Sequence, residues 1–192
     1  MKIKPVYQKI YQLAAPHLCI RHNDVHTEIC LRFGYRLMKA EGGNERIVIP
    51  AIILHDVGWE KVPEELHLKA FGPEATMPEL TRMHEVEGVK IAKDILEKVN
   101  YDAEEMIQIL EIIDGHDTRK QAISLNDQVV KDADKLWRFS RKGFYIDIKR
   151  FGESYAQGLS RIRKNFPTCF FTNTARKLAG KELQKREREP AR

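Results

Sequence analysis

The sequence predicts an all-α protein that folds as a compact helical bundle. Three observations support this. Apolar residues recur every three or four positions along most of the chain, helix-capping residues precede several of these segments, and no stretch alternates apolar and polar residues long enough to build a sheet. The chain has 192 residues, 42% of them hydrophobic, with no internal repeat or long linker. We therefore expect a single domain over residues 1–192.

The first part of the chain predicts two amphipathic helices and a short apolar one. The first helix ends before Pro16. Asp24 is placed to cap the second, which stops at the Gly42-Gly43 break. The apolar run around Pro50 fits a buried strand or a buried helix, and a proline tolerated in a first helical turn favours the helix. The predicted helices cover residues 3–15, 24–39 and 47–56.

Prolines and capping residues divide the rest of the chain. Three prolines and a glycine make Val62–Pro78 a loop with a short helical piece. Asp102 with Glu105, and Ser124 with Asp127, have the spacing of capping boxes, so each pair starts a helix. The helices predicted here cover residues 78–99, 102–115, 124–140, 152–165 and 172–188.

The cysteine content and the lack of long apolar segments indicate a cytoplasmic protein. Cys19, Cys30 and Cys169 have no Cys-x-x-Cys spacing, which fits a reducing compartment and neither a disulfide scaffold nor a thiolate zinc site. No segment is long and apolar enough to span a bilayer. The Met1–Pro5 segment has no apolar stretch behind it, so we expect no signal peptide and no membrane partner.

The net charge is +5, with 33 Lys and Arg against 28 Asp and Glu. Such a modest excess suits an anionic partner but is common in ordinary proteins. Basic residues cluster between Arg138 and Lys164, and we interpret them as solvated helix faces, because no aromatic residues are interleaved as in single-strand binders. A nucleic-acid partner is therefore disfavoured, whereas a homo-oligomer is left open.

Titratable side chains fall on the apolar faces of five predicted segments. His26, for example, is followed by Cys30, Phe33 and Leu37 at helical spacing and so shares their face. One such histidine is usually a hydrogen-bonded core residue. A whole set in one small core needs a common partner, since a buried polar group without one costs about 1–3 kcal/mol. The inward-facing groups are His26, His55, Asp56, His84, His116 and Asp134.

A divalent metal is the simplest common partner for these groups. Nitrogen and oxygen donors without a thiolate suit iron, manganese, nickel, cobalt or zinc in an open site that keeps water. His55 and Asp56 are neighbours, and neighbouring side chains on a helix point about 100° apart. Both can reach one ion only at a helix end, and Gly58 supplies that end.

The order of these residues resembles a known family. The order along the chain is His26, the pair His55-Asp56 and then Asp134. This order is similar to that in the HD-domain metal-dependent phosphohydrolases, an all-α superfamily named for its His-Asp pair. The resemblance implies that these four side chains bind a metal ion.

The local sequence around two of these motifs also resembles the family. Ala51–Gly58 is similar to its apolar-His-Asp-apolar-Gly helix end, and Val130–Trp137 to its last motif. The resemblance covers about residues 23–139, which leaves C-terminal helices and a charged tail over residues 140–192. Several subfamilies have a lysine after the HD-x-G turn, where this chain has Trp59.

Two further histidines resemble a subset of the family that holds two metals. His84 and His116 lie where that subset has its extra histidines. The resemblance implies that Asp56 bridges from the first metal to a second one held by His84 and His116. The expected cofactor is therefore one or two divalent transition metals.

The predicted activity is hydrolysis of a phosphate ester. Metals held by imidazole and carboxylate lower the pKa of bound water to about 7, which supplies a metal-activated hydroxide. The resemblance makes a nucleotide the expected substrate, with Asp56 in a catalytic as well as a metal-binding role. The alternative is a non-catalytic HD module that senses a metal or a nucleotide.

Four charged residues near the predicted ligands are candidates for supporting roles. Lys135 follows Asp134 and is the predicted catalytic and substrate-binding cation, or else a surface lysine. Arg21, ahead of the His26 helix, is a second substrate-binding candidate. Asp132 and Asp117 are placed to orient ligand histidines, and a cap-like role is the alternative for both.

Overall fold

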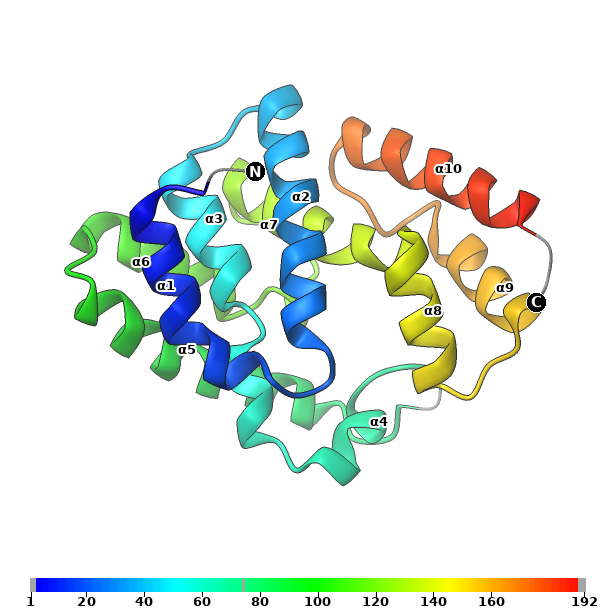
Figure 1. Cartoon of the computed structure of the whole chain (residues 1–192), viewed down its shortest axis with the longest axis horizontal. Helices are drawn as coiled ribbons and strands as arrows, with labels where there is room; N and C mark the ends of the chain where they lie inside the picture. The colour runs from blue at the N-terminus through cyan, green and yellow to red at the C-terminus, as the bar shows by residue number, and fades with distance from the viewer. Residues whose placement is uncertain (1–2, 74, 190–192) are drawn as a thin grey trace.

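All regular secondary structure in the part of the chain that the computed structural model describes, residues 3–73 and 75–189, is helical (Figure 1). The predicted all-α fold is thus confirmed. Met1 and Lys2 of the N-terminal segment and the last three residues of the charged tail lie outside the described residues. The α-helices are α1 (Pro5–Ala14), α2 (Asn23–Glu41), α3 (Glu45–Leu54), α4 (His67–Ala70), α5 (Glu79–Lys98), α6 (Ala103–Ile113), α7 (Leu125–Leu136), α8 (Arg141–Arg150), α9 (Tyr155–Asn165) and α10 (Asn173–Arg188), and 3₁₀ turns η1 to η4 cover Ala15–Leu18, Val57–Lys61, Glu64–Leu66 and Trp137–Phe139.

Helix α3 forms the centre of the fold. Every residue from Ile47 to Leu54 is buried, because α1, α2, α6 and α7 all pack against this helix. Helix α5 packs against α6 and the η2 turn, while α8, α9 and α10 form the opposite side of the molecule (Figure 1).

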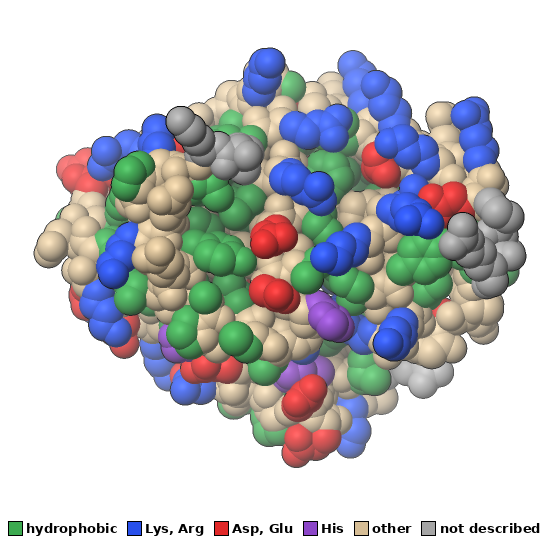
Figure 2. Space-filling model, in the orientation of Figure 1, with side chains coloured by type: hydrophobic (Ala, Val, Ile, Leu, Met, Phe, Trp, Pro, Cys, Tyr) green, Lys and Arg blue, Asp and Glu red, His purple; other side chains and the backbone are tan. Residues whose placement is uncertain are grey.

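No helix within the described ranges has both the length and the apolar character needed to cross a membrane. Figure 2 shows Lys and Arg side chains gathered over the part of one face that α2, α8 and α10 form.

The starts of α2 and α3 are among those that differ from the prediction. Helix α2 begins at Asn23, directly after the left-handed residue His22 (φ 60°), and no side chain caps it. Asp24 lies in the first turn and is exposed, so the prediction that Asp24 caps the helix is wrong. Helix α3 begins earlier than predicted because the Asn44 side chain accepts a hydrogen bond from the Arg46 amide at 2.9 Å.

Pro50 lies inside α3 rather than in its first turn, so that part of the prediction is wrong. A proline has no N–H, so the carbonyl of Arg46, four residues earlier, loses its helical donor. The Tyr101 hydroxyl, from the segment between α5 and α6, donates to this carbonyl at 2.6 Å. A long-range hydrogen bond thus replaces the one that the proline removes.

Tyr101→Phe is expected to lower the free energy of unfolding by about 1 kcal/mol, because it leaves the Arg46 carbonyl without this donor. Urea unfolding measures the change. In a Pro50→Ala background the helix regains its own N–H donor, so the same Tyr101→Phe change should cost less. An equal cost in both backgrounds would show that the hydroxyl does not compensate for the proline.

The segment around Ser140 also differs from the prediction. Helix α7 ends at Leu136 instead of about Ser140, and the Ser140 side chain caps α8, a helix that is not among those predicted, by accepting from the Gly143 amide at 3.1 Å. Gly143 lets α8 approach η4 closely, since a Cβ there would overlap the Trp137 carbonyl. A glycine and several β-branched and aromatic residues weaken the helical signal of α8.

Candidate metal centre

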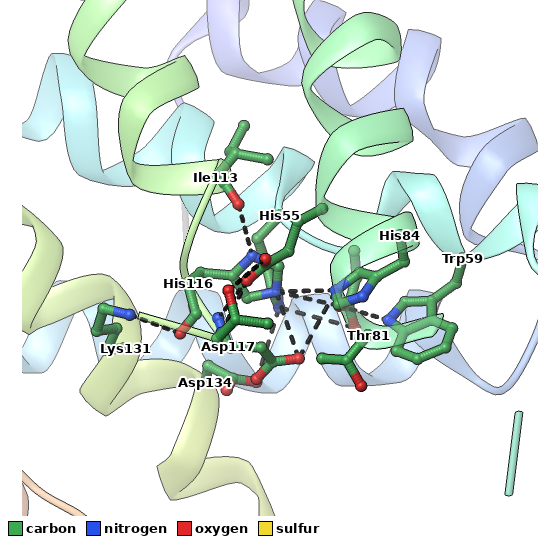
Figure 3. A network of polar contacts seen from close by, with 12 residues as sticks. His55, Trp59, Thr81, His84, Ile113, His116, Asp117, Lys131 and Asp134 are labelled. Atoms are coloured by element: carbon green, nitrogen blue, oxygen red, sulfur yellow. Dashed lines mark hydrogen bonds and ion pairs between the residues drawn. The ribbon is translucent and has the colours of Figure 1, made fainter. Parts of the chain in front are cut away.

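The six titratable side chains predicted to face the interior converge at one place in the core, and Figure 3 labels four of them there, His55, His84, His116 and Asp134. None of them exposes more than 8% of its surface. They come from α2 (His26), the end of α3 (His55 and Asp56), α5 (His84), the loop after α6 (His116) and α7 (Asp134). The structure therefore brings together all six.

Four of these side chains form a first cluster of donor atoms. His26 Nε2 lies 2.9 Å from His55 Nε2, 3.3 Å from Asp134 Oδ1 and 3.4 Å from Asp56 Oδ2. His55 Nε2 lies 3.7 Å from each of the same two carboxylate oxygens. Ligands held about 2.1 Å from one ion lie about 3.0–3.4 Å from each other. The cluster therefore has close to the size of a coordination shell.

A second cluster adjoins the first and shares Asp56. His84 Nε2 and His116 Nε2 lie 3.3 Å apart. The second oxygen of Asp56, Oδ1, lies 3.7 Å from His116 Nε2 and 3.9 Å from His84 Nε2. The two oxygens of one carboxylate thus face two separate pairs of imidazoles.

Asp117 belongs to the second cluster. Its Oδ2 lies 3.6 Å from His84 Nε2 and 3.8 Å from His116 Nε2. The Asp117 carboxylate thus faces the same Nε2 atoms that would bind an ion, and its role in orienting a histidine stays a prediction. With His84 and His116 it forms one of the residue groups whose donor atoms could hold a metal.

Backbone carbonyls fix the orientation of two of the histidines. The Nδ1–H of His55 donates to the Ile52 carbonyl at 2.8 Å. The Nδ1–H of His116 donates to the Ile113 carbonyl at 2.9 Å, and Figure 3 labels both of these residues. A proton held at Nδ1 leaves the lone pair of Nε2 directed into the cluster. These two rings are therefore preset as Nε2 ligands.

The charges in the centre strongly perturb its pKa values. Burial alone would raise the pKa of Asp56, but the charge of His55 and the nearby His116 imidazole hold this pKa well below its usual range. Burial would lower the pKa of His116, but the charge of Asp117 and the nearby Asp56 carboxylate raise it to about 10. Burial, with the charge of His116, lowers the pKa of His84 to about 4. Two neighbouring imidazoles thus differ in protonation at neutral pH.

Trp59 packs directly against the second cluster. Its ring stacks on His84 with centroids 4.1 Å apart and an interplanar angle of 15°. Its Nε1–H donates to Asp56 Oδ1 at 3.1 Å. Where several HD subfamilies have a lysine, this chain thus has an aromatic residue that supports two members of the centre.

Gly58 does not end a helix in the way the sequence predicts. Helix α3 ends at Leu54, and Gly58 lies inside the η2 turn, where it contacts α5. A Cβ on Gly58 would overlap the His84 carbonyl oxygen and would lie 2.8 Å from Gly88 Cα. Two glycines thus let the backbones that carry Asp56 and His84 approach each other.

Two buried charged residues that the sequence analysis did not single out hold the loop of His116. Glu85 accepts hydrogen bonds from the amides of Asp117 and Thr118, both at 2.9 Å. The Lys131 ammonium donates to the carbonyls of Gly115, His116 and Arg119 at 2.5, 2.8 and 2.9 Å. Both groups are separated from the loop in sequence, so no local motif marks them.

Lys131→Met is expected to lower the free energy of unfolding by about 2–3 kcal/mol, because it leaves buried carbonyls without a donor. Metal binding at His84 and His116 should weaken as well, since the His116 loop loses its anchor. Thermal unfolding and a metal titration measure the two effects. Lys90→Met on the exposed face of α5 is the matched control and should change neither. An unchanged stability of Lys131→Met would contradict this role.

Asp132 and Lys135 lie on either side of Asp134 but have different surroundings. Both oxygens of Asp132 accept backbone hydrogen bonds ahead of α10, from the Phe171 amide at 2.9 Å and the Thr172 amide at 2.8 Å. The predicted role of Asp132 beside a ligand histidine is therefore wrong.

The Lys135 Nζ lies 4.9 Å from the centroid of the Phe171 ring, and Lys135 lines a cavity together with Asp117 and Asp134. Its catalytic role stays a prediction.

A cavity of about 160 Å³ opens beside the two clusters. Asp56, Asp117 and Asp134 form one part of its wall, and three arginines form another. Among these, the Arg21 guanidinium lies between the rings of Trp59 and Phe71, 3.7 and 4.1 Å from their centroids. The other two are Arg138 and Arg150.

The fold and this centre define an all-α protein with a buried His/Asp site that could hold divalent metal ions. The family model of the HD domain matches residues 23–138, more than half of the chain. The chain belongs to the HD-domain family, as the resemblance of its motifs predicts.

A solved structure supports the fold. It is the crystal structure of a predicted HD superfamily hydrolase from an uncultured Thermotogales bacterium, at 1.45 Å resolution. The two chains share 19% sequence identity and superpose with a TM-score of 0.60 over 93% of this chain and 85% of the other. A comparison with curated proteins gives no match.

Proposed function

We propose that this protein is a metal-dependent phosphohydrolase that cleaves a phosphate ester, with a nucleotide as the substrate. One observation carries the proposal. The two carboxylate oxygens of Asp56 face two different clusters of imidazoles, beside a cavity lined with arginines. The similar structure from an uncultured Thermotogales bacterium, a predicted HD superfamily hydrolase, supports the same class.

The donor set fits divalent transition metals. All its atoms are imidazole nitrogens or carboxylate oxygens, and the histidines with a fixed tautomer present Nε2 to the clusters. His26, His55 and Asp134 would hold one ion, His84 and His116 a second, and Asp56 both. Asp117 is a further ligand for the second ion.

When bound, divalent ions make water a nucleophile at neutral pH and stabilise negative charge on a phosphoryl group. The chain supplies the rest of the site. Arg21 Nε and Nη1 are buried without a hydrogen-bond partner among the described residues, so they are free to bind phosphoryl oxygens. Burial lowers the pKa of Arg21 to about 9, which leaves it positive at neutral pH.

A buried carboxylate holds the other two arginines of the cavity in place. Asp147 Oδ1 lies 3.2 Å from Arg150 Nη1, and its Oδ2 lies 3.4 Å from Arg138 Nη1. The guanidinium groups therefore keep their positions on the cavity wall before a substrate arrives. A fixed array of cations suits a phosphoryl group whose charge grows during the reaction.

Metal affinity is expected to rise with pH. The pKa of His116, raised to about 10, means that this imidazole is protonated near pH 7 when no ion is bound, and the pKa of His55 is raised as well. An ion must displace the extra proton of such an imidazole, so affinity should rise about tenfold per pH unit for each proton released. Calorimetric titration with Mn²⁺ in buffers of different ionisation enthalpy measures the release. An affinity that stays constant between about pH 6 and 8 would contradict the assignment.

The proposed function is tested with protein purified anaerobically and loaded with one metal at a time. We expect Mn²⁺ or Fe²⁺ to support phosphate release from 4-nitrophenyl phosphate, and His55→Ala to abolish it. If no first-row metal supports release although nucleotides bind tightly, the protein is a sensor module instead. Nucleic-acid binding that weakens steeply with salt and persists in His55→Ala would favour a basic binding protein.

A further inference from the structure

A groove much larger than the metal-centre cavity opens next to it. The groove has a volume of about 1210 Å³, against about 160 Å³ for the cavity. Arg21, Phe71 and Arg150 line both spaces, so the groove and the cavity adjoin at these residues. Pockets for whole small molecules usually measure about 300–1,000 Å³. The cavity therefore has room for a phosphoryl group but not for a nucleotide-sized ester, and the groove is the larger space beside it that can take the remainder of such a substrate.

One helix supplies a wall of the groove. Four residues of α8 that line the groove lie on one helix face, because they are spaced by three, one and three positions. They are Lys142, Tyr145, Ile146 and Lys149. The face thus has an apolar and aromatic middle with a lysine at each end. It lies in the basic region of Figure 2.

Apolar residues line the groove outside α8 as well, among polar ones such as His22 and His67. Val25 of α2 lines it, together with Leu68 and Phe71 from α4 and the residue after it. Leu68 exposes 49% of its surface, although it is a large hydrophobic residue. A ring-shaped or aliphatic group in the groove would therefore remove apolar surface of residues such as Leu68 and Tyr145 from water.

The groove is also strongly positive. Glu64 is the one acidic residue among those lining it, against Arg21, Arg141, Lys142, Lys149 and Arg150. Arg141 is paired with Glu189 at 3.1 Å. Within the described part of the chain, no carboxylate lies within ion-pair distance of Lys142 or Lys149. Their charges are therefore available to a ligand.

We propose that this groove binds the leaving group of the substrate, and that this group carries a ring and a second anionic group. The inference rests on the proposed function, because the scissile phosphoryl group lies at the metal centre. The ring packs on the middle of the α8 face, and the second anion pairs with the lysine at one end of this face, Lys142 or Lys149. The preferred substrate is therefore a phosphate ester with two separate negative groups, such as a nucleoside bisphosphate.

The test compares adenosine 5′-monophosphate with adenosine 3′,5′-bisphosphate, which differ by one phosphate. Calorimetry measures the binding of each to the metal-loaded protein, and phosphate release gives KM. We expect the bisphosphate to bind about tenfold more tightly, a modest factor because each surface charge pair contributes little. The double variant Lys142→Ala/Lys149→Ala should remove this preference. Both lysines are exposed, so the double variant should fold.

A variant with the same loss of charge serves as the control. Lys93→Ala/Lys98→Ala removes two exposed lysines of α5 that line neither the cavity nor the groove, and it should keep the preference. If wild-type protein binds both nucleotides equally, or if the α8 variant keeps the preference, the inference is wrong.

Failure of the inference can be told apart from failure of the proposed function. Release of phosphate from 4-nitrophenyl phosphate, combined with no effect of the α8 lysines on either nucleotide, would reject the groove assignment and keep the hydrolase. Lysine-dependent preference for the bisphosphate without phosphate release under any metal would keep the groove as an anion-binding site and reject the hydrolase.

Discussion

Asp56→Ala is expected to lose the metal ions of both clusters. The two oxygens of this carboxylate face different pairs of histidines, so the substitution removes a donor atom from each cluster. Changing a residue behind a ligand already costs about 10–100-fold in metal affinity, so loss of a direct ligand to both ions should exceed that range. Elemental analysis after metal loading measures the loss, and phosphate release should fall below detection.

Asp94→Ala is the matched control for this variant, since it removes an exposed carboxylate from α5. It should keep the full metal content and activity. The Asp56→Ala protein should also stay folded, because its helices and apolar core are unchanged, and circular dichroism checks this. A folded Asp56→Ala protein that keeps its full metal content would show that Asp56 does not join the two clusters.

Gly58→Ala is expected to cause a large loss of stability. The new Cβ would overlap the His84 carbonyl oxygen and press on the backbone of Gly88, and neither backbone can rotate away as a flexible side chain would. Inserting a methyl group into a packed core costs typically about 1–3 kcal/mol, and contact with backbone places this case at or above the upper end. Urea unfolding, or loss of soluble protein, measures the effect.

Gly180→Ala in α10 is the matched control. The nearest atom to a Cβ there is Phe166 Cζ at 3.5 Å, an ordinary contact. Alanine is the better helix former by about 1 kcal/mol, so this variant should be as stable as the wild type or more stable. If Gly58→Ala is as stable as Gly180→Ala, the η2 turn and α5 are not in the close contact described above.

Local sequence patterns were sufficient to predict the fold class and the six converging side chains. Helical periodicity places a histidine such as His26 on an apolar face, and this face is buried wherever the helix packs. Capping residues gave correct helix starts where the cap is local, as at Asp102 and Ser124. In both cases the physical cause acts within one or two helical turns, so the sequence records it.

The features that the sequence did not predict depend on contacts between distant segments. The hydroxyl that compensates for Pro50 comes from Tyr101, and the anchors of the His116 loop come from Glu85 and Lys131. The place of Asp117 among the donor atoms follows from the path of that loop. No local spacing encodes these pairings, because each arises only when the helices have packed.

The most direct test of the account is anomalous diffraction from crystals grown with Mn²⁺. We predict two peaks about 3.5–4 Å apart, one beside His26, His55 and Asp134 and the other beside His84 and His116, with Asp56 between them. A single peak at the first position, with His84 and His116 free of metal, would contradict the two-metal centre. Absence of any peak among these residues would contradict the metal centre itself.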